Sequence, residues 1–272
     1  SGMVASPDEL KERVREAQTL VREINMGATA IGTGLNAHPD YAERVTQKLR
    51  ELSNVPVIMS QNLVEATQDT GAYVQLSGVL KRVAVKLSKI CNDLRLLSSG
   101  PRAGLHEINL PARAPGSSIM PGKVNPIIPE VVNQVAFEVI GNDLTVTMAA
   151  EAGQLELNVM EPVIAYSLFT SLDMLGRACR TLSEHCIQGI TANREVCRRM
   201  VENSIGLVTA LNPLLGYEKC TEISGIAMTT GRSVYEIVLE KGYLTKAELD
   251  DVLSPENMTR PRYLHRRNDA ST

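Results

Sequence analysis

One short segment, Gly116–Pro126, holds two hydroxyl groups, one cation and one amide within nine positions. These groups belong, in chain order, to Ser117, Ser118, Lys123 and Asn125. Two glycines and two prolines in the same segment predict a bent loop. Residues 127–150 have the pattern of a long helix, so the loop lies beside a helix N-terminus, where free backbone N–H groups favour an anion. Because the phosphate-loop pattern is absent, a carboxylate is the expected ligand.

Two other interpretations of this segment stay open at the level of the residues. A Gly/Pro-rich connection between helices could carry the same polar side chains without a function. A serine hydrolase is the alternative enzyme, although the Gly-x-Ser-x-Gly pattern is absent. His106 lies eleven residues before Ser117, which leaves spatial contact between the two open.

Three residues outside the hydroxyl pair are further candidates that could support a site. Thr33 lies in Gly32-Thr33-Gly34, which no strand precedes, so a tight turn or a ligand-facing loop is expected rather than a dinucleotide site. Arg102 supplies a guanidinium suited to a carboxylate or to a structural ion pair. Glu130 falls in the first turn of the helix after the loop, where the helix dipole alone favours an acid.

The periodicity of apolar residues predicts an all-α protein built on an elongated bundle of long helices. The long segments expected to be helical are residues 7–26, 40–52, 62–98, 127–150 and 157–187. After Gly189 the helices become shorter, with expected segments at 193–202, 205–215, 218–230, 234–241 and 246–253. The segment 246–253 opens with a capping box at Thr245-Lys246-Ala247-Glu248. We therefore predict a bundle domain over residues 1–188 and a smaller helical domain over residues 189–272.

Composition argues against several classes of partner. The net charge is −3 and aromatic residues make up 3% of the 272 residues, with no Trp, which is unlike a nucleic-acid-binding surface. The sequence contains no run of 18 apolar residues, so no membrane span is expected. The five cysteines form no Cys-x-x-Cys pair, which is typical of buried free thiols in a reducing compartment. A cytoplasmic protein is expected.

Several segments together resemble the fumarase/aspartase superfamily of lyases. The most specific is Gly-Ser-Ser-Ile-Met-Pro-Gly-Lys-Val-Asn-Pro at Gly116–Pro126. Further matches are Gly32–Asn36, the helix around Lys89–Arg95 and the chain through about Leu264. Within the superfamily, two stretches are more similar to the aspartase (aspartate ammonia-lyase) branch than to class II fumarases, Leu96–Leu105 and Ala149–Pro162.

This resemblance implies a fold, a reaction and a set of roles. It implies a homotetramer around a bundle of long helices, with each active site assembled from three subunits. It implies elimination of ammonia from L-aspartate to give fumarate, with no cofactor and no metal site evident in these residues. Ser117 would be the base, and Lys123 and Asn125, with Ser118 beside them, would bind the substrate carboxylate. Glu130 would take the place of a fumarase glutamate that pairs with an active-site histidine.

The resemblance also leaves two alternatives. The family's chains are longer at the N-terminus, and the substrate-binding loops of that part have no counterpart here, so we expect this sequence to be the central and C-terminal part of such an enzyme. A class II fumarase, which adds water, is the second enzymatic hypothesis. A catalytically incomplete helical assembly fragment is the third.

Overall fold

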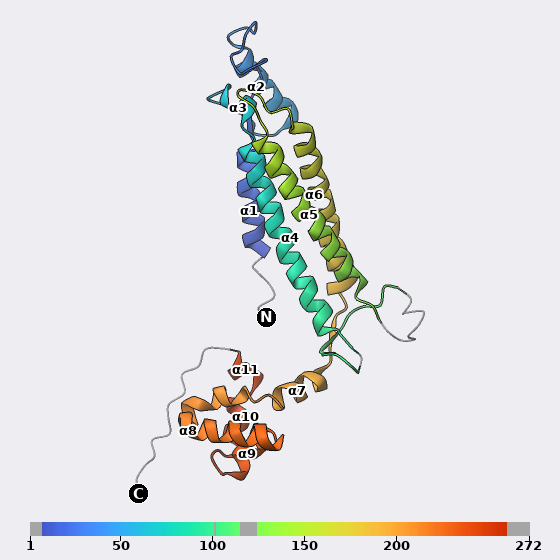
Figure 1. Ribbon diagram of the computed structural model, residues 1–272, viewed down its shortest axis with the longest axis vertical. Coiled ribbons are helices and arrows are strands. Elements are labelled where there is room, and N and C mark those ends of the chain that lie inside the picture. The colour runs from blue at the N-terminus through green and yellow to red at the C-terminus, as the bar shows by residue number, and fades with distance from the viewer. Residues whose placement is uncertain (1–6, 101, 115–123, 260–272) are drawn as a thin grey trace. The chain divides into compact units, whose positions relative to one another are not determined.

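The structure is a computed structural model that describes residues 7–100, 102–114 and 124–259. The chain divides into two compact units, Ser1–Thr191 and Ala192–Thr272 (Figure 1). Both are helical, which confirms the predicted fold class. Among the described residues, no helix combines the length and apolar character needed to cross a membrane.

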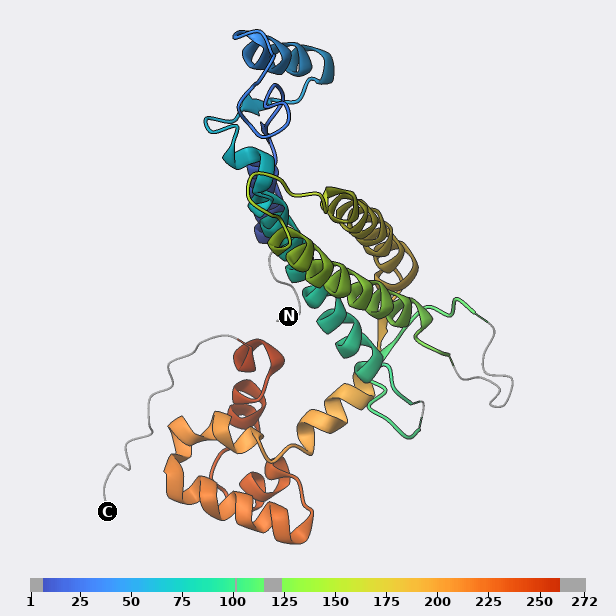
Figure 2. The same cartoon turned by 45° about the horizontal axis from the view of Figure 1, so that its top comes forward.

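The first unit is built on three long helices, α4, α5 and α6, which pack against one another (Figures 1 and 2). Its helices are α1 (Pro7–Leu20), α2 (Tyr41–Ser53), α3 (Glu65–Gln68), α4 (Gly71–Leu97), α5 (Ile127–Glu151) and α6 (Glu161–Leu182). A π-helical turn, η1 (Ser183–Ile187), continues α6. Two-residue strands pair as β1 (Glu23–Ile24) with β2 (Ile58–Met59), and as β3 (Ile108–Asn109) with β4 (Thr191–Ala192).

Three predicted helices differ from the structure, one by an internal break and two at an end. The helix expected over 62–98 is interrupted, because Asp69 has an extended backbone between α3 and α4. The helix expected over 7–26 ends at Leu20, and residues 23–24 pair as a strand instead. The helix expected to begin at Leu157 begins at Glu161, since Leu157 forms a β-bridge with Gln154. The predicted helix over 127–150 agrees with α5 to within one residue.

Apolar side chains fill the space between the three long helices, and polar groups fix how α4 and α5 align. Leu80, Val139 and Ile164 belong to one buried cluster of α4, α5 and α6. Asp143 of α5 is buried and accepts hydrogen bonds from Ser77 at 2.8 Å and Lys81 at 2.6 Å. Because a buried carboxylate needs partners, a shift of α4 along α5 would leave Asp143 unsatisfied.

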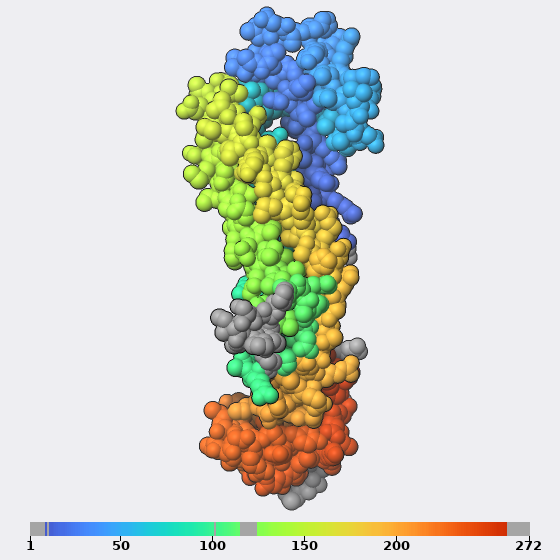
Figure 3. Space-filling view, turned by 90° about the vertical axis from the view of Figure 1, so that its right-hand side faces the viewer, coloured from blue at the N-terminus to red at the C-terminus, as the bar shows by residue number. Residues whose placement is uncertain are grey.

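Helices α5 and α6 each carry large apolar side chains that are exposed. Figure 3 shows α5 and α6 next to each other on one face of the first unit. On these helices Phe137 is 61% exposed and Phe169 is 71% exposed, and further exposed members are Leu144, Met148 and Tyr166. Helices that expose this much apolar area usually cover it with another protein surface.

The second unit has its own core of short helices. They are α7 (Arg194–Glu202), α8 (Leu207–Thr230), α9 (Val234–Glu240), α10 (Lys246–Val252) and α11 (Pro255–Met258). Leu211, Ile223, Ile237 and Leu249 are fully buried in its core. Gly216 has non-helical dihedral angles and kinks α8, in agreement with the two helices expected there. The Thr245–Glu248 capping box is present as predicted.

Candidate functional site

The predicted loop is described only at its two flanks. Ser117, Ser118 and Lys123 lie outside the described residues. The chain is described up to Ala114 on one side and from Val124 on the other. The candidate site is therefore built from these flanks and from the elements that hold them.

Both flanks lie against the π-helical turn η1 that ends α6. Before the loop, the Arg113 guanidinium donates to the backbone carbonyl oxygens of His185 at 2.9 Å and Glu184 at 3.3 Å. After the loop, Asn125 and Pro126 line a small crevice together with His185 and Cys186. π-helical turns are rare and are frequent at functional sites. Here the turn gives the two ends of the loop a common support.

Asn125 and Glu130 lie where the sequence places them, on either side of the start of α5. The Asn125 carbonyl oxygen accepts the N–H of Ile127 at 2.9 Å, and the Glu130 N–H donates to the Pro126 carbonyl oxygen at 3.1 Å. Both side chains are partly exposed. The Asn125 amide therefore lies beside a helix N-terminus, which is the environment expected for a group that binds an anion.

The segment between α4 and β3 folds into a compact loop. Ser99 organises it, since its hydroxyl accepts the Leu105 N–H at 3.0 Å and its carbonyl oxygen accepts the His106 N–H at 2.8 Å. A Cβ atom at Gly104 would lie 2.5 Å from the Ser99 carbonyl group, so only glycine fits there. His106 itself has φ of +50°, in the left-handed region that histidine tolerates better than most residues.

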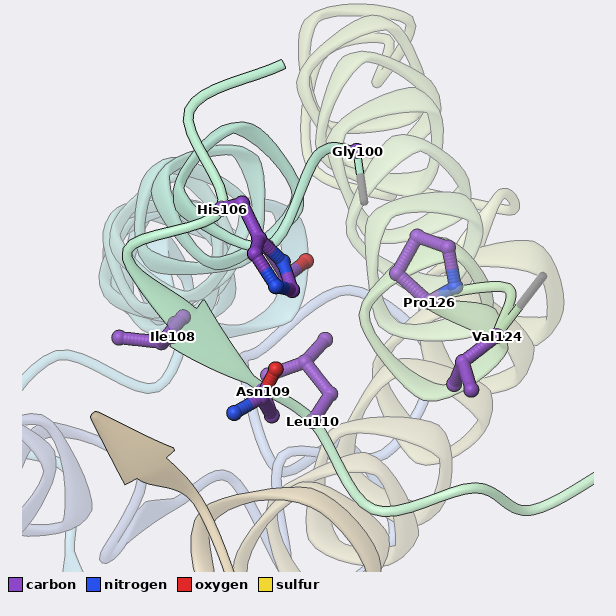
Figure 4. Close-up of a pocket in the computed structure, with 8 residues that line it drawn as sticks. Gly100, His106, Ile108, Asn109, Leu110, Val124 and Pro126 are labelled. Carbon is purple, nitrogen blue, oxygen red and sulfur yellow. The ribbon is translucent and has the colours of Figure 1, made fainter. Parts of the chain in front are cut away.

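This loop, β3 and the residues before α5 line an open cavity of about 200 Å³ (Figure 4). In the close-up, His106 lies on one side of the cavity, and Val124 and Pro126 lie on the other. Its lining residues are Ser98, Gly100, His106, Ile108, Asn109, Leu110, Val124 and Pro126. The Asn109 amide nitrogen donates to the Thr191 hydroxyl at 3.1 Å, which fixes that wall.

The other two candidate residues, Arg102 and Thr33, lie in different loops. Arg102 belongs to the loop that borders the cavity, and its side chain is exposed. Thr33 is exposed in a loop at the other end of the bundle. The backbone of its neighbour Gly32 packs closely against Val64, since a Cβ atom at Gly32 would lie 2.2 Å from Val64 Cα. The 27 residues of α4, about 40 Å of helix, separate that end from Ser98. Within one chain, Thr33 and Asn125 do not come together.

Two buried thiols of the bundle are unsuited to nucleophilic chemistry. Cys91 of α4 and Cys186 of η1 are buried in the same apolar cluster. Burial raises the pKa of the Cys91 thiol to about 12, and it also raises the pKa of Cys186. Thiols with raised pKa values stay protonated and unreactive near neutral pH. Among the described residues, no group of three or more His, Cys, Asp or Glu side chains could hold a metal ion.

Two of the residues that shape the site escaped the reasoning from sequence. Asn109 and Arg113 lie in a stretch without a recognisable motif, and their partners lie 82 and 72 residues away. The sequence suggests His106 only as a partner of a nucleophilic serine. The spacing of Gly100 and Gly104 before it was the signal for a tightly folded loop.

Two family profiles match parts of this chain. The lyase family profile matches residues 1–141, and the profile of the fumarase C C-terminus matches residues 207–260. The chain is 63% identical to an aspartate ammonia-lyase of Helicobacter pylori over 95% of its own length and 55% of that protein. The chain thus spans about half the length of the curated relatives it matches.

Two solved structures extend the comparison to the fold. A fumarate lyase:delta crystallin from Brucella melitensis, bound to cobalt, matches with a TM-score of 0.89 and 55% identity, over 93% of this chain and 55% of that one. A class II fumarase from Schistosoma mansoni matches with a TM-score of 0.87 and 33% identity, over 94% of this chain and 56% of that one.

Proposed function

Because the chain belongs to the fumarase/aspartase family of lyases, we propose that it takes part in the reversible elimination of ammonia from L-aspartate to give fumarate. The observation that carries this proposal is the 63% identity to an aspartate ammonia-lyase, together with the Gly116–Pro126 motif. The identity to the class II fumarase is 33%, so hydration of fumarate is the less favoured alternative.

In the proposed reaction Ser117 is the base. Its oxygen takes the proton from C3 of L-aspartate, and the electron pair of the broken C–H bond moves into the neighbouring carboxylate. The C2–N bond then breaks, ammonia leaves, and a double bond joins C2 to C3. Because negative charge grows on the carboxylate, donors fixed beside it stabilise the transition state more than the ground state.

Lys123 and Asn125 are the proposed donors to that carboxylate, with Ser118 beside them. The position of Asn125 supports this role, because its backbone is tied to the first turn of α5 and its side chain lies beside the helix N-terminus. Glu130, in the same turn, and Arg102 are proposed to support the site rather than to contact the reacting atoms. The elimination itself needs no cofactor.

We further propose that the active site is shared between copies of the chain in a cytoplasmic homotetramer. The exposed apolar side chains of α5 and α6, including Phe137 and Phe169, supply a surface for association. Thr33 and Asn125 are separated by the length of α4 within one chain. A role for Thr33 at the substrate therefore requires a second copy.

A comparison of two substrates tests the proposed reaction. The protein as it is produced in its own cells is purified, its intact mass is measured, and fumarate absorbance is followed with L-aspartate and with L-malate. The proposal predicts fumarate and an equal amount of ammonia from L-aspartate. Fumarate from L-malate alone would establish the fumarase alternative. No fumarate from either substrate would favour a non-catalytic helical assembly.

A further inference from the structure

We propose that Asn133 of α5 is a positioning residue, which holds the carboxylate-binding amide of Asn125 in place by fixing the start of α5 against the end of α4. The role of Asn125 in this proposal rests on the proposed function. The hydrogen bonds of Asn133 and their effect on the start of α5 are independent of that function.

The first argument is that the buried Asn133 amide has partners on α4 for both of its polar atoms. Its side chain is 3% exposed. Nδ2 donates to the Ser88 hydroxyl at 2.8 Å, to the Ser88 carbonyl oxygen at 3.1 Å and to Asn92 Oδ1 at 3.0 Å. Oδ1 accepts from the Arg95 guanidinium at 3.4 Å. Because a buried amide without partners is costly, the alignment of α4 and α5 that supplies these partners is favoured over others.

The second argument is where these partners lie on α4. Their spacing of four and then three residues places all three on one face of the helix. Arg95 is in the last turn of α4, which leads directly into the Ser98–Glu107 loop. That loop contributes one side of the cavity, and Val124 and Pro126 contribute the other (Figure 4). Asn133 therefore joins the helix that ends at one side of the cavity to the helix that begins at the other.

A second polar contact between the same helices has the same register. α4 and α5 run in opposite directions (Figures 1 and 2). Asp143 lies ten residues after Asn133 on α5, and its partner Ser77 lies eleven residues before Ser88 on α4. Buried polar groups can fix the register of paired helices in this way. Asp143 is about 15 Å further along α5, so Asn133 is the contact that acts near the candidate site.

The third argument is how the position of α5 reaches Asn125. The Ile127 N–H donates to the Asn125 carbonyl oxygen at 2.9 Å, and the Glu130 N–H donates to that of Pro126 at 3.1 Å. These bonds join the Asn125 backbone to the first turn of α5. A rotation or shift of that turn therefore moves the Asn125 amide with it. A displacement of about 1 Å at a reacting group can reduce catalysis about 100-fold.

Hydrogen exchange at the start of α5 tests the positioning without any need for catalysis. Asn133→Leu removes the hydrogen bonds and nearly keeps the size of the side chain. Asn142→Leu is the matched control, because Asn142 lies on the same helix and donates to the Ser171 hydroxyl of α6 at 3.2 Å. In the protein as it is produced in its own cells, amide exchange at residues 127–130 should accelerate about tenfold in Asn133→Leu and less than about twofold in Asn142→Leu. Equal exchange there in the two variants would overturn the proposal.

A double-mutant cycle on kcat/KM for L-aspartate separates positioning from a loss of stability. Asn133→Leu should lower kcat/KM on the order of tenfold in the parent protein. In an Asn125→Ala background it should lower kcat/KM less than about threefold, because the amide through which it acts is gone. Asn142→Leu should change kcat/KM by less than about twofold in both backgrounds. Additive effects of Asn133→Leu and Asn125→Ala, or an unchanged kcat/KM in Asn133→Leu, would overturn the proposal.

Asn92→Ala is a milder variant that decides the question if Asn133→Leu does not fold. Asn92 is exposed and supplies one of the acceptors of Asn133, so its loss should leave the bundle intact. Exchange at residues 127–130 should rise about two- to threefold and kcat/KM should fall by a similar factor. Parental exchange in this variant would contradict the proposal. If the parent protein forms no fumarate from L-aspartate, the proposed function fails, and the exchange measurements alone decide whether Asn133 fixes the start of α5.

Discussion

The Arg113 guanidinium donates through Nε to the backbone carbonyl oxygen of His185 at 2.9 Å. This contact links the segment before the predicted catalytic loop to the π-helical turn that ends α6. The segment after the loop meets the same turn, since Asn125 and Pro126 line a crevice with His185 and Cys186. The turn therefore supports both ends of the loop.

Arg113→Met should loosen this support without unfolding the bundle, because methionine keeps the apolar stem but has no donors. The exchange of backbone amides in residues 110–114 and 183–187 should accelerate on the order of tenfold, equivalent to about 1.4 kcal/mol. Hydrogen exchange read by mass spectrometry measures this directly. Arg177→Met is the control, because Arg177 forms an exposed pair with Asp173 within α6. Unchanged exchange in both segments would contradict the anchoring role of Arg113.

Gly104→Ala should disrupt the loop that presents His106. The added Cβ atom would lie 2.5 Å from the Ser99 carbonyl group, so the backbone must move, at an expected cost of about 1–3 kcal/mol in the free energy of unfolding. The His106 imidazole signal should shift as well. Gly176→Ala is the matched control, since nothing lies within 4 Å of that Cβ position in α6. It should leave His106 unchanged and stabilise the chain by about 0.5–1 kcal/mol.

The buried Cys91 thiol should make the bundle sensitive to alkali. Burial raises its pKa to about 12, from an ordinary value of about 8.5. The folded state therefore keeps the proton that the unfolded state releases. The stabilising effect is fully present below about pH 8.5 and is lost as the pH rises towards 12, with a slope of up to about 1.4 kcal/mol per pH unit.

Urea denaturation at several alkaline pH values measures that slope. Cys91→Ala should lower the free energy of unfolding at every pH, because it leaves a cavity, but it should reduce the alkaline slope. Leu80→Ala, which leaves a cavity in the same helix but removes no titrating group, should keep the parental slope. Equal slopes for Cys91→Ala and the parent chain would show that this thiol does not link folding to pH.

The fold could be predicted from sequence wherever local signals agree. The helix over 127–150 was found to within a residue, because its apolar pattern begins after Pro126 and ends before Gly153. The break before α4 was missed, although the apolar pattern pauses over residues 67–71 and Gly71 stands at the break, because apolar residues resume at helical spacing directly after it and no proline marks it. The early end of α1 was missed because residues 23–24 pair with β2, a contact that lies 35 positions away.

In the candidate site, too, some positions follow from the local sequence and others from contacts between distant parts of the chain. The positions of Asn125 and Glu130 follow from a local motif and a helix start. The placement of His106 depends on how the Ser98–Glu107 loop folds onto Ser99, and the role of Arg113 depends on a partner 72 residues later in the chain. Neither can be read from spacing alone.

The most direct test of the central claim is the turnover of L-aspartate by Ser117→Ala and Ser118→Ala, compared with the parent protein in its native assembly. Loss of the general base should reduce fumarate formation by about 10²–10⁴-fold in Ser117→Ala, whereas Ser118→Ala should keep more activity. Circular dichroism confirms that each variant keeps its helices. A parent protein that makes no fumarate from L-aspartate, or a Ser117→Ala variant that makes it at the parental rate, would contradict the account.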